Sequence, residues 1–306
     1  MASLGGLMAI RVVSDSSSNL LTLSDIDYKT VPLKIMFGSN EYIDKVGTDV
    51  AQMVRNLQTH SGPSTTSCPN VHDWLSAFEG ADEVFAITIS SGLSASFESA
   101  EMAREMYQTS HPGARVHIFD SKATGPVMQL VIESLRDGIL AGKTYDEIIE
   151  ETNEVLKHTR ILYALQSLNN LANNGRVNSH VARLVDALNI RIIGHASLEG
   201  TIELIHRCRG EKRTLKTIVT EMAEQGCDGG KVRIDHCLNE TAAQALANLI
   251  IEAYPQADVV IRPCGALCSY YADMGGLIIG YESATTRTSK QKEPAPSVKG
   301  LRKHFT

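Results

Sequence analysis

The segment Ser90-Ser91-Gly92-Leu93-Ser94-Ala95-Ser96 concentrates hydroxyl groups at one point of the chain. It follows an apolar run, Val84 to Ile89, and opens a helical pattern that continues to Tyr107. A strand, a tight turn and a helix in this order present serine hydroxyls and free backbone amides together. The stretch from Gly92 to Ser96 also differs only in its last residue from the Gly-x-Ser-x-Gly elbow of hydrolases, so Ser94 is a candidate nucleophile.

A nucleophilic serine requires a base, and no histidine stands out as that base. The histidines that follow the serine segment lie in contexts typical of surface or strand-end positions: His111, His117, His158, His180, His195, His206 and His236. Serine is also a preferred N-cap residue, so simple helix capping remains an open interpretation of the serine segment.

A second hydroxyl-rich segment, Pro63-Ser64-Thr65-Thr66-Ser67-Cys68-Pro69, precedes a helical pattern from Val71 to Phe78. Pro69 is expected in the first turn of that helix, where proline is best tolerated. Neither this segment nor the serine segment contains a lysine or an arginine. Hydroxyls at a helix N-terminus without nearby cations favour a single carboxylate over a cluster of phosphates.

Two further motifs are weaker indications of a ligand site. Asp15-Ser16-Ser17-Ser18-Asn19 follows the first expected strand, where ligands of open α/β sheets bind, but a plain Asx turn explains it equally well. Gly138 to Thr144 resembles a phosphate-binding loop, yet it has one residue too few between its glycines and follows a helix. We interpret Gly142 as a helix end and Thr144 as the cap of the next helix.

Alternating strand and helix patterns position these motifs. Apolar, β-rich runs predict strands at Ala9 to Val13, Thr30 to Phe37, Val84 to Ile89 and Arg115 to Phe119. Helical patterns lie between or after them, at residues 50–58, 71–78, 94–107 and 125–140. This rhythm is typical of a parallel sheet flanked by helices. Met102, Met106 and Tyr107 are expected on a buried helix face.

The character of the sequence changes near residue 156. Thr144-Tyr145-Asp146-Glu147 has the form of a capping box, and its helix is expected to reach about His158. A helix, turn and helix follow from Leu165 to Leu188, and short apolar runs then alternate with two long helical patterns. We predict a parallel-sheet α/β domain over residues 9–155, a mixed α/β domain over 156–283 and a basic flexible tail over 284–306.

Composition excludes several classes of function. The 306 residues carry a formal net charge of -6, and basic residues gather only in the tail, so nucleic acid is not an expected partner. No apolar stretch reaches the roughly 20 residues that span a bilayer, and the first residues lack the features of a signal peptide. The six cysteines contain no Cys-x-x-Cys pair and are expected to be free thiols, which favours a cytoplasmic protein.

Taken in order, these motifs resemble the DegV family of bacterial fatty-acid-binding proteins. The similarity runs from about Ile10 to Tyr281. Cys68 takes the place of a glutamine in the family's Thr-Ser-Gln-Pro loop. The segments that carry the resemblance are Val13-Ser14-Asp15-Ser16-Ser17-Ser18, Val31-Pro32-Leu33-Lys34-Ile35, Thr66-Ser67-Cys68-Pro69, Ser90 to Phe97, Phe119-Asp120-Ser121, Leu168 to Leu171 and Asn174-Gly175-Arg176-Val177.

The resemblance implies a two-domain α/β fold that holds one long-chain fatty acid, such as palmitate or stearate, in a tunnel between the domains. It implies a carrier that presents the acid to a fatty acid kinase, rather than an enzyme. Tyr271 is the nearest counterpart of a histidine that the family usually has in this region. The residues implied to hold the carboxylate are Thr66, Ser67, Ser91, Gly92 and Ser94, with Arg176 and Tyr271 beside the headgroup.

Physical chemistry is consistent with such a ligand. Burial of an acyl chain gains roughly 0.8 kcal/mol per methylene, so hydroxyls and amides need only orient the carboxylate. This requires no metal and no cofactor. Two alternatives remain: a serine hydrolase of acyl esters that uses Ser94, and a lipid-sensing regulatory protein whose basic tail docks on a partner.

Overall fold

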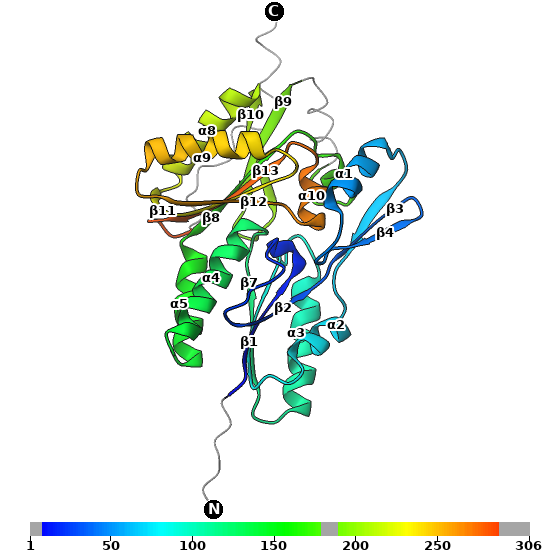
Figure 1. Cartoon of the computed structure of the whole chain (residues 1–306), viewed down its shortest axis with the longest axis vertical. Coiled ribbons are helices and arrows are strands. Elements are labelled where there is room, and N and C mark those ends of the chain that lie inside the picture. The colour runs from blue at the N-terminus through cyan, green and yellow to red at the C-terminus, as the bar shows by residue number, and fades with distance from the viewer. Residues whose placement is uncertain (1–7, 179–188, 288–306) are drawn as a thin grey trace, which may run out of the picture.

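The computed structural model describes residues 8–178 and 189–287. A four-stranded parallel sheet with the order β2-β1-β6-β7 forms the first half of the molecule. β6 is buried along its whole length because helices cover both faces of the sheet (Figure 1). The strands are β1 (Ile10–Asp15), β2 (Asp27–Val31), β6 (Glu83–Thr88) and β7 (Arg115–Asp120).

Helices α2 (Val71–Phe78) and α3 (Ser96–Ser110) pack on one face of this sheet, and α4 (Pro126–Leu140) packs on the other. α3 contacts the core through Ala100, Ala103 and Tyr107. The prediction that Met102 and Met106 belong to the buried face is wrong, because these side chains are 56% and 54% exposed on the opposite side of the helix.

A small antiparallel sheet, β4-β3-β5, extends from the first half of the molecule. Its strands are β3 (Lys34–Phe37), β4 (Asn40–Ile43) and β5 (Ser64–Ser67), and α1 (Val50–Thr59) connects β4 to β5. The single strand predicted from Thr30 to Phe37 is therefore divided between two sheets. The division falls at Pro32, which has no N–H to donate to a strand ladder.

A six-stranded mixed sheet with the order β10-β9-β8-β13-β11-β12 forms the second half. Only β11 and β12 are parallel neighbours among these described strands. The strands are β8 (Thr159–Leu165), β9 (Ile190–Ala196), β10 (Ile202–Arg209), β11 (Cys227–His236), β12 (Asp258–Pro263) and β13 (Leu277–Ser283).

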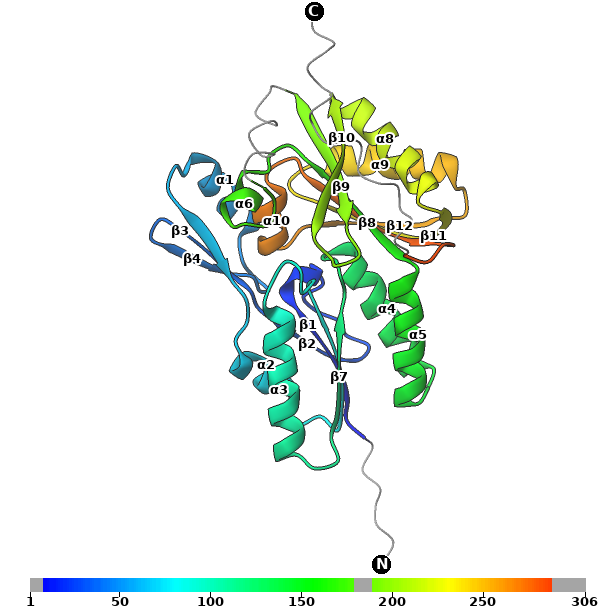
Figure 2. The same cartoon turned by 180° about the vertical axis from the view of Figure 1, so that it is seen from behind.

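Helix α4 lies between the two large sheets and contacts strands of both. Helices α8 (Glu211–Glu224) and α9 (Glu240–Ala253) cover the far face of the second sheet, as Figures 1 and 2 show. α5 (Tyr145–Lys157) packs on α4 and begins at the predicted capping box of Thr144 and Glu147. The two-domain α/β fold is confirmed, whereas the division at residues 155 and 156 stays a prediction.

Two elements of the second half differ from the predicted pattern. Leu165 ends strand β8 instead of beginning a helix, and all seven residues of that strand are buried, so no polar alternation marks it. A short helix, α6 (Asn169–Asn173), follows, while the predicted second helix lies largely outside the described residues. α10 (Ala266–Ala272) was not foreseen. The predicted tail beyond residue 287 also lies outside the described residues.

Candidate functional site

The carboxyl ends of β1 and β6 lie at the point where the order of the parallel sheet reverses, with β2 on one side and β7 on the other. Open α/β sheets bind ligands at such a crevice. Asp15, at the end of β1, accepts hydrogen bonds from the Ile89 amide at 2.8 Å and from Ser96 Oγ at 2.7 Å. These bonds hold the serine segment and the start of α3 at this edge, which faces the second sheet.

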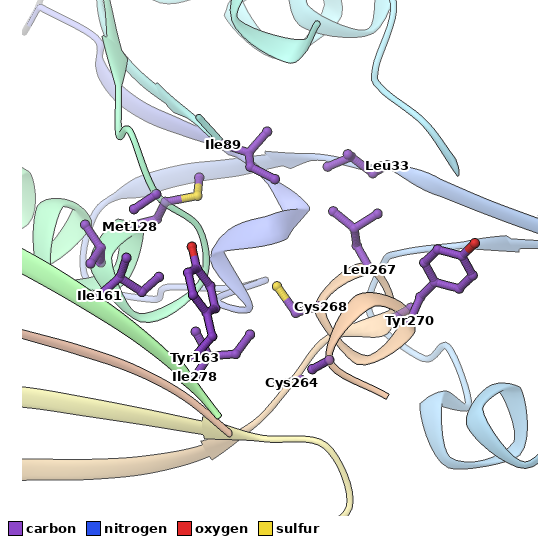
Figure 3. Close-up of a cluster of buried hydrophobic side chains, with 14 of the residues drawn as sticks. Leu33, Ile89, Met128, Ile161, Tyr163, Cys264, Leu267, Cys268, Tyr270 and Ile278 are labelled. Atoms are coloured by element: carbon purple, nitrogen blue, oxygen red, sulfur yellow. The ribbon is translucent and has the colours of Figure 1, made fainter. Parts of the chain in front are cut away.

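A cavity of about 250 Å³ opens at this edge, and both halves of the chain form its wall. Most of the wall is apolar, and Figure 3 shows wall residues from separate parts of the chain, such as Ile89, Tyr163 and Leu267, around one space. The apolar wall includes Leu33, Ile89, Leu165, Leu171, Leu267 and Ile278. The wall also carries one group of polar side chains, here named the polar end: Thr66, Ser67, Ser94, Arg176 and Tyr271.

Thr66 and Tyr271 join the two halves of the chain at the polar end. Thr66 Oγ1 and Tyr271 Oη lie 2.7 Å apart, one on β5 and the other on α10. Burial is the main cause that raises the pKa of Tyr271, so its hydroxyl is neutral. Each hydroxyl has one proton, so one of the pair can donate to a carboxylate while their mutual hydrogen bond is kept, and both can donate only when that bond is exchanged for the ligand.

The amides of α2 are not part of this end of the cavity. The helix begins after Asn70, which forms a capping box with Asp73, so Pro69 precedes the cap instead of lying in the first turn as predicted. The capping box occupies amides that were expected to attract an anion. In this segment, the groups left to bind a carboxylate at the cavity are therefore the hydroxyls of Thr66 and Ser67.

The start of α3 differs from that of α2. No side chain caps this helix at Ala95, and both Ala95 and Ser94 line the cavity. Ser94 Oγ accepts a bond of 3.3 Å from the Ser96 amide and can still donate its own proton. The uncapped N-terminus of a fifteen-residue helix contributes partial positive charge beside Ser94.

Arg176 reaches the cavity through a turn that the backbone specifies. α6 ends in a Schellman motif, in which the Arg176 amide donates to Leu171 O at 2.7 Å and Gly175 adopts φ +74°. The guanidinium donates through Nε to Leu93 O at 3.0 Å and through Nη1 to Asn174 O. No carboxylate among the described residues forms an ion pair with this guanidinium, which lines the cavity.

Ser91 and Gly92, also predicted to hold the carboxylate, do not line the cavity. Lys122 Nζ donates to Ser91 Oγ at 2.9 Å and forms an ion pair of 2.7 Å with Asp120. A Cβ atom at Gly92 would lie 2.7 Å from the carbonyl oxygen of Glu199 in the β9–β10 turn. In this structure the two residues shape the serine segment and its contact with the second sheet.

The cavity wall also includes residues that the sequence analysis did not single out, among them Thr124, Tyr163 and Cys268. Cys268 Sγ donates to Ser17 O at 3.3 Å, and burial raises the pKa of this thiol, so it is protonated. Tyr163 and Cys268 lie on β8 and α10, and the sequence patterns predicted neither of these elements.

Three buried carboxylates, here named the junction carboxylates, flank the cavity: Asp15, Asp44 and Asp235. Asp44 accepts from the Ala266 and Leu267 amides at 2.7 and 3.2 Å, at the start of α10. Asp235 accepts from Asn19 and Gln129 side-chain amides at 2.5 and 2.9 Å.

Desolvation governs the titration of the junction carboxylates. Burial raises the pKa of Asp44 to about 6 and that of Asp235 to about 7, and it also raises the pKa of Asp15. The expected Asx turn at Asp15 is present, because its side chain accepts from the Ser17 amide. Within residues 8–178 and 189–287, no group of three or more acidic, histidine or cysteine side chains is placed to hold a metal ion.

The model of the DegV family, described as a family of uncharacterised proteins, matches residues 9–283 of the chain. The chain belongs to the DegV family. A DegV domain-containing protein of Streptococcus gordonii is 35% identical over 279 residues, which cover 90% of this chain and 99% of that protein. The resemblance inferred from the ordered motifs is thereby confirmed.

Solved structures of DegV proteins share the whole fold. A DegV family protein from Eubacterium eligens loaded with heptadecanoic acid is 41% identical, with a TM-score of 0.88, and covers 90% of this chain and 100% of its own. The Fatty Acid Kinase (Fak) B3 protein of Streptococcus pneumoniae loaded with linoleic acid is 34% identical, with the same TM-score and coverage.

Among the residues that the structure describes, the elbow-like serine of this DegV chain forms no hydrogen bond with a histidine. Ser94 Oγ meets the Ser96 amide, and no histidine among the described residues contacts it. His195 and His206 are paired with Glu203 and Glu221 on the second sheet and α8. His180 lies outside the described residues. None of the described helices of this chain is both long enough and apolar enough to cross a bilayer.

Proposed function

We propose that this DegV chain binds one long-chain fatty acid, with the carboxylate at the polar end and the acyl chain along the apolar wall. The observation that carries the proposal is the division of one cavity into a cationic, hydroxyl-lined group and an apolar remainder. Arg176 supplies the charge, and Thr66, Ser67, Ser94 and Tyr271 supply the donors. A carboxylate meets both needs and carries one charge.

The energetics favour a long chain over a short one. Each methylene that leaves water contributes roughly 0.8 kcal/mol, whereas a hydrogen bond to a charged group contributes about 1.5–3 kcal/mol. The cavity volume of about 250 Å³ lies just below the range of roughly 300–1,000 Å³ common for ligand pockets. We therefore expect the walls, which come from both halves of the chain, to move apart slightly when the acid enters.

The relatives support a finer proposal. The Eubacterium eligens and Streptococcus pneumoniae proteins are loaded with fatty acids, and the second is named for a fatty acid kinase. We infer that this chain is a carrier that presents its acid to a fatty acid kinase and does not itself catalyse a reaction. The six free thiols, five of them buried, are consistent with work in the reducing cytoplasm.

Mass spectrometry of the protein purified from its native host tests the proposal directly. Sprayed intact, the protein should carry one fatty acid, which should separate after denaturation. Purified protein should also bind added palmitate or stearate at one site. An empty protein that rejects both acids would contradict the proposal.

A second experiment separates a carrier from an enzyme. Loaded protein, a fatty acid kinase and ATP together should yield an acyl phosphate, whereas loaded protein and ATP alone should yield none. Hydrolysis of a chromogenic acyl ester by the chain alone, abolished by Ser94→Ala, would instead establish the hydrolase.

A further inference from the structure

The hydroxyl of Tyr163 is a buried polar group without a partner on the wall of the cavity. Tyr163 is 4% exposed and lines the cavity, and its Oη forms no hydrogen bond with any described residue. Figure 3 shows the ring projecting from β8 with its hydroxyl directed away from the second sheet, toward the side of Ile89 and Met128. Buried hydroxyls in proteins nearly always have partners, so this one requires an explanation.

The position of Tyr163 separates it from the carboxylate site. β8 runs from Thr159 to Leu165 and leads into α6 and the turn that carries Arg176. Tyr163 lies two residues before Leu165 on the same face of the strand, about 7 Å farther from that turn. It therefore faces the path of the acyl chain and not the carboxylate.

Apolar side chains lie beside the ring, and the Arg287 guanidinium acts electrostatically on the hydroxyl without forming a hydrogen bond to it. Ile89 and Ile278 line the cavity near it, and Ile278 is its register partner on β13. Two polar groups of the wall, Thr124 and Cys268, both donate hydrogen bonds to Ser17 O, at 3.3 Å. Burial raises the pKa of Tyr163, so the group is a neutral donor throughout the physiological range.

We propose that the acyl chain preferred by this protein carries an oxygen, as a hydroxyl or oxo group, near its middle, where it accepts a hydrogen bond from Tyr163 Oη. This inference rests on the proposed binding of a fatty acid. Phenylalanine would fill the same volume without the unmet donor, whereas tyrosine is favourable when the ligand supplies the acceptor. A site that contains a donor for a ligand oxygen disfavours the analogue that lacks it.

Competitive binding of three acids to the full chain tests the inference: stearate, oleate and a stearate with a mid-chain hydroxyl. The hydroxylated acid should bind roughly three- to tenfold more tightly than stearate, the range expected for one hydrogen bond. Oleate is the control for chain shape, because it is bent but has no mid-chain hydrogen-bonding group. Its affinity should exceed that of stearate by less than the affinity of the hydroxylated acid does. An isomer with the hydroxyl beside the carboxylate should bind no better than stearate.

The variant Tyr163→Phe should abolish this preference and bind stearate at least as well as the original protein. Its melting temperature without ligand should rise, because the unmet donor is removed. Tyr281→Phe is the matched control: this buried tyrosine lies on the opposite face of the sheet, where its Oη bonds Gln225 at 3.0 Å. It should leave the ratio of the two affinities unchanged.

The outcomes distinguish this inference from the function on which it rests. Equal affinity for stearate and the hydroxylated acid, or an unchanged ratio in Tyr163→Phe, would overturn the inference while leaving fatty-acid binding intact. A lower melting temperature in Tyr163→Phe would also overturn it, since the hydroxyl would then be satisfied within the protein. Failure to bind every acid would overturn the proposed function as well.

Discussion

The junction carboxylates and the polar end both place polar atoms in the interior, but their donors and acceptors are matched differently. Each oxygen of Asp15, Asp44 and Asp235 accepts at least one hydrogen bond from the protein. At the polar end, the described partners of the Arg176 guanidinium are carbonyl oxygens, and the hydroxyls of Thr66 and Tyr271 are hydrogen-bonded to each other. A buried polar cluster whose acceptors are all hydrogen-bonded, like the junction carboxylates, stabilises the fold. A cluster with unused donors and no ion-pair partner among the described residues, like the polar end, is suited to bind a ligand.

The variant Asp44→Ala should reveal the structural side of this comparison with the largest effect. It leaves the amides of Ala266 and Leu267 buried without an acceptor, and two such losses cost roughly 2–5 kcal/mol. Urea denaturation should show the fall in the free energy of unfolding. Asp44→Asn keeps one acceptor oxygen and should lose less. Unchanged stability combined with lost lipid binding would place Asp44 in the ligand site instead.

The variant Arg176→Ala should lose fatty-acid affinity more than stability, the opposite of Asp44→Ala. Removal of the charge opposite the carboxylate should weaken fatty-acid binding by about 1.5–3 kcal/mol, with a smaller change in stability. Arg176→Lys keeps the charge but not the forked geometry, so its affinity should be intermediate. Isothermal titration of both variants supplies the measurement. An Arg176→Ala protein that unfolds readily but binds normally would reverse the assignment.

The pH dependence of stability sharpens the structural side further. A carboxyl whose pKa is raised in the folded state holds its proton more tightly there than in the unfolded chain. The contribution of these carboxyls to the free energy of unfolding is therefore greatest below about pH 4. It falls as the pH rises toward about 6 for Asp44 and about 7 for Asp235, and at higher pH it no longer changes.

Denaturation at about pH 5 and about pH 8 should detect a loss of roughly 4 kcal/mol from Asp44 and Asp235 together. Asp235→Asn removes one titrating group, and its new side-chain oxygen can still accept hydrogen bonds from Asn19 and Gln129. The stability of this variant should therefore depend less on pH. The groups that face Asp235, including Arg262 and Cys264, are unchanged in that variant. A variant profile as steep as the original would show that another group titrates.

The variants Thr66→Val and Ser91→Ala test the smallest expected effect, the loss of fatty-acid affinity when a single hydroxyl is removed. Valine keeps the shape of Thr66 but removes one donor, so affinity should fall by about 0.5–1.5 kcal/mol. Ser91 lies outside the cavity wall beside Lys122, so Ser91→Ala should leave the affinity unchanged. Equal losses in a competition assay with a fluorescent fatty acid would show that both serine and threonine segments touch the carboxylate.

The sequence predicted the parts of the site that follow regular patterns. The strand that ends at the serine segment and the capping of α5 were recognisable from local patterns. The ordered family motifs led to Arg176 and Tyr271. These features depend on neighbours in the chain, which is the information that a single sequence carries most directly.

The rest depended on tertiary packing. β8 is buried on both faces, so its apolar run shows no alternation, and it follows α5 almost directly. α10 has only seven residues, two of them tyrosines and one a cysteine. Because neither element was foreseen, the positions of Tyr163 and Cys268 could not be predicted. The partners of Asp44 were equally hidden, since they lie more than two hundred residues along the chain.

That long separation also determines the order in which the molecule can be completed during synthesis. Asp44 and Tyr271 lie at opposite ends of the described chain, yet α10 joins them beside one cavity. A ribosome that has made only the parallel sheet has made the serine segment but neither Arg176 nor α10. Contacts this distant in sequence form late in folding. The nascent chain therefore should not retain a fatty acid before α10 emerges, and lipid capture would mark the end of maturation.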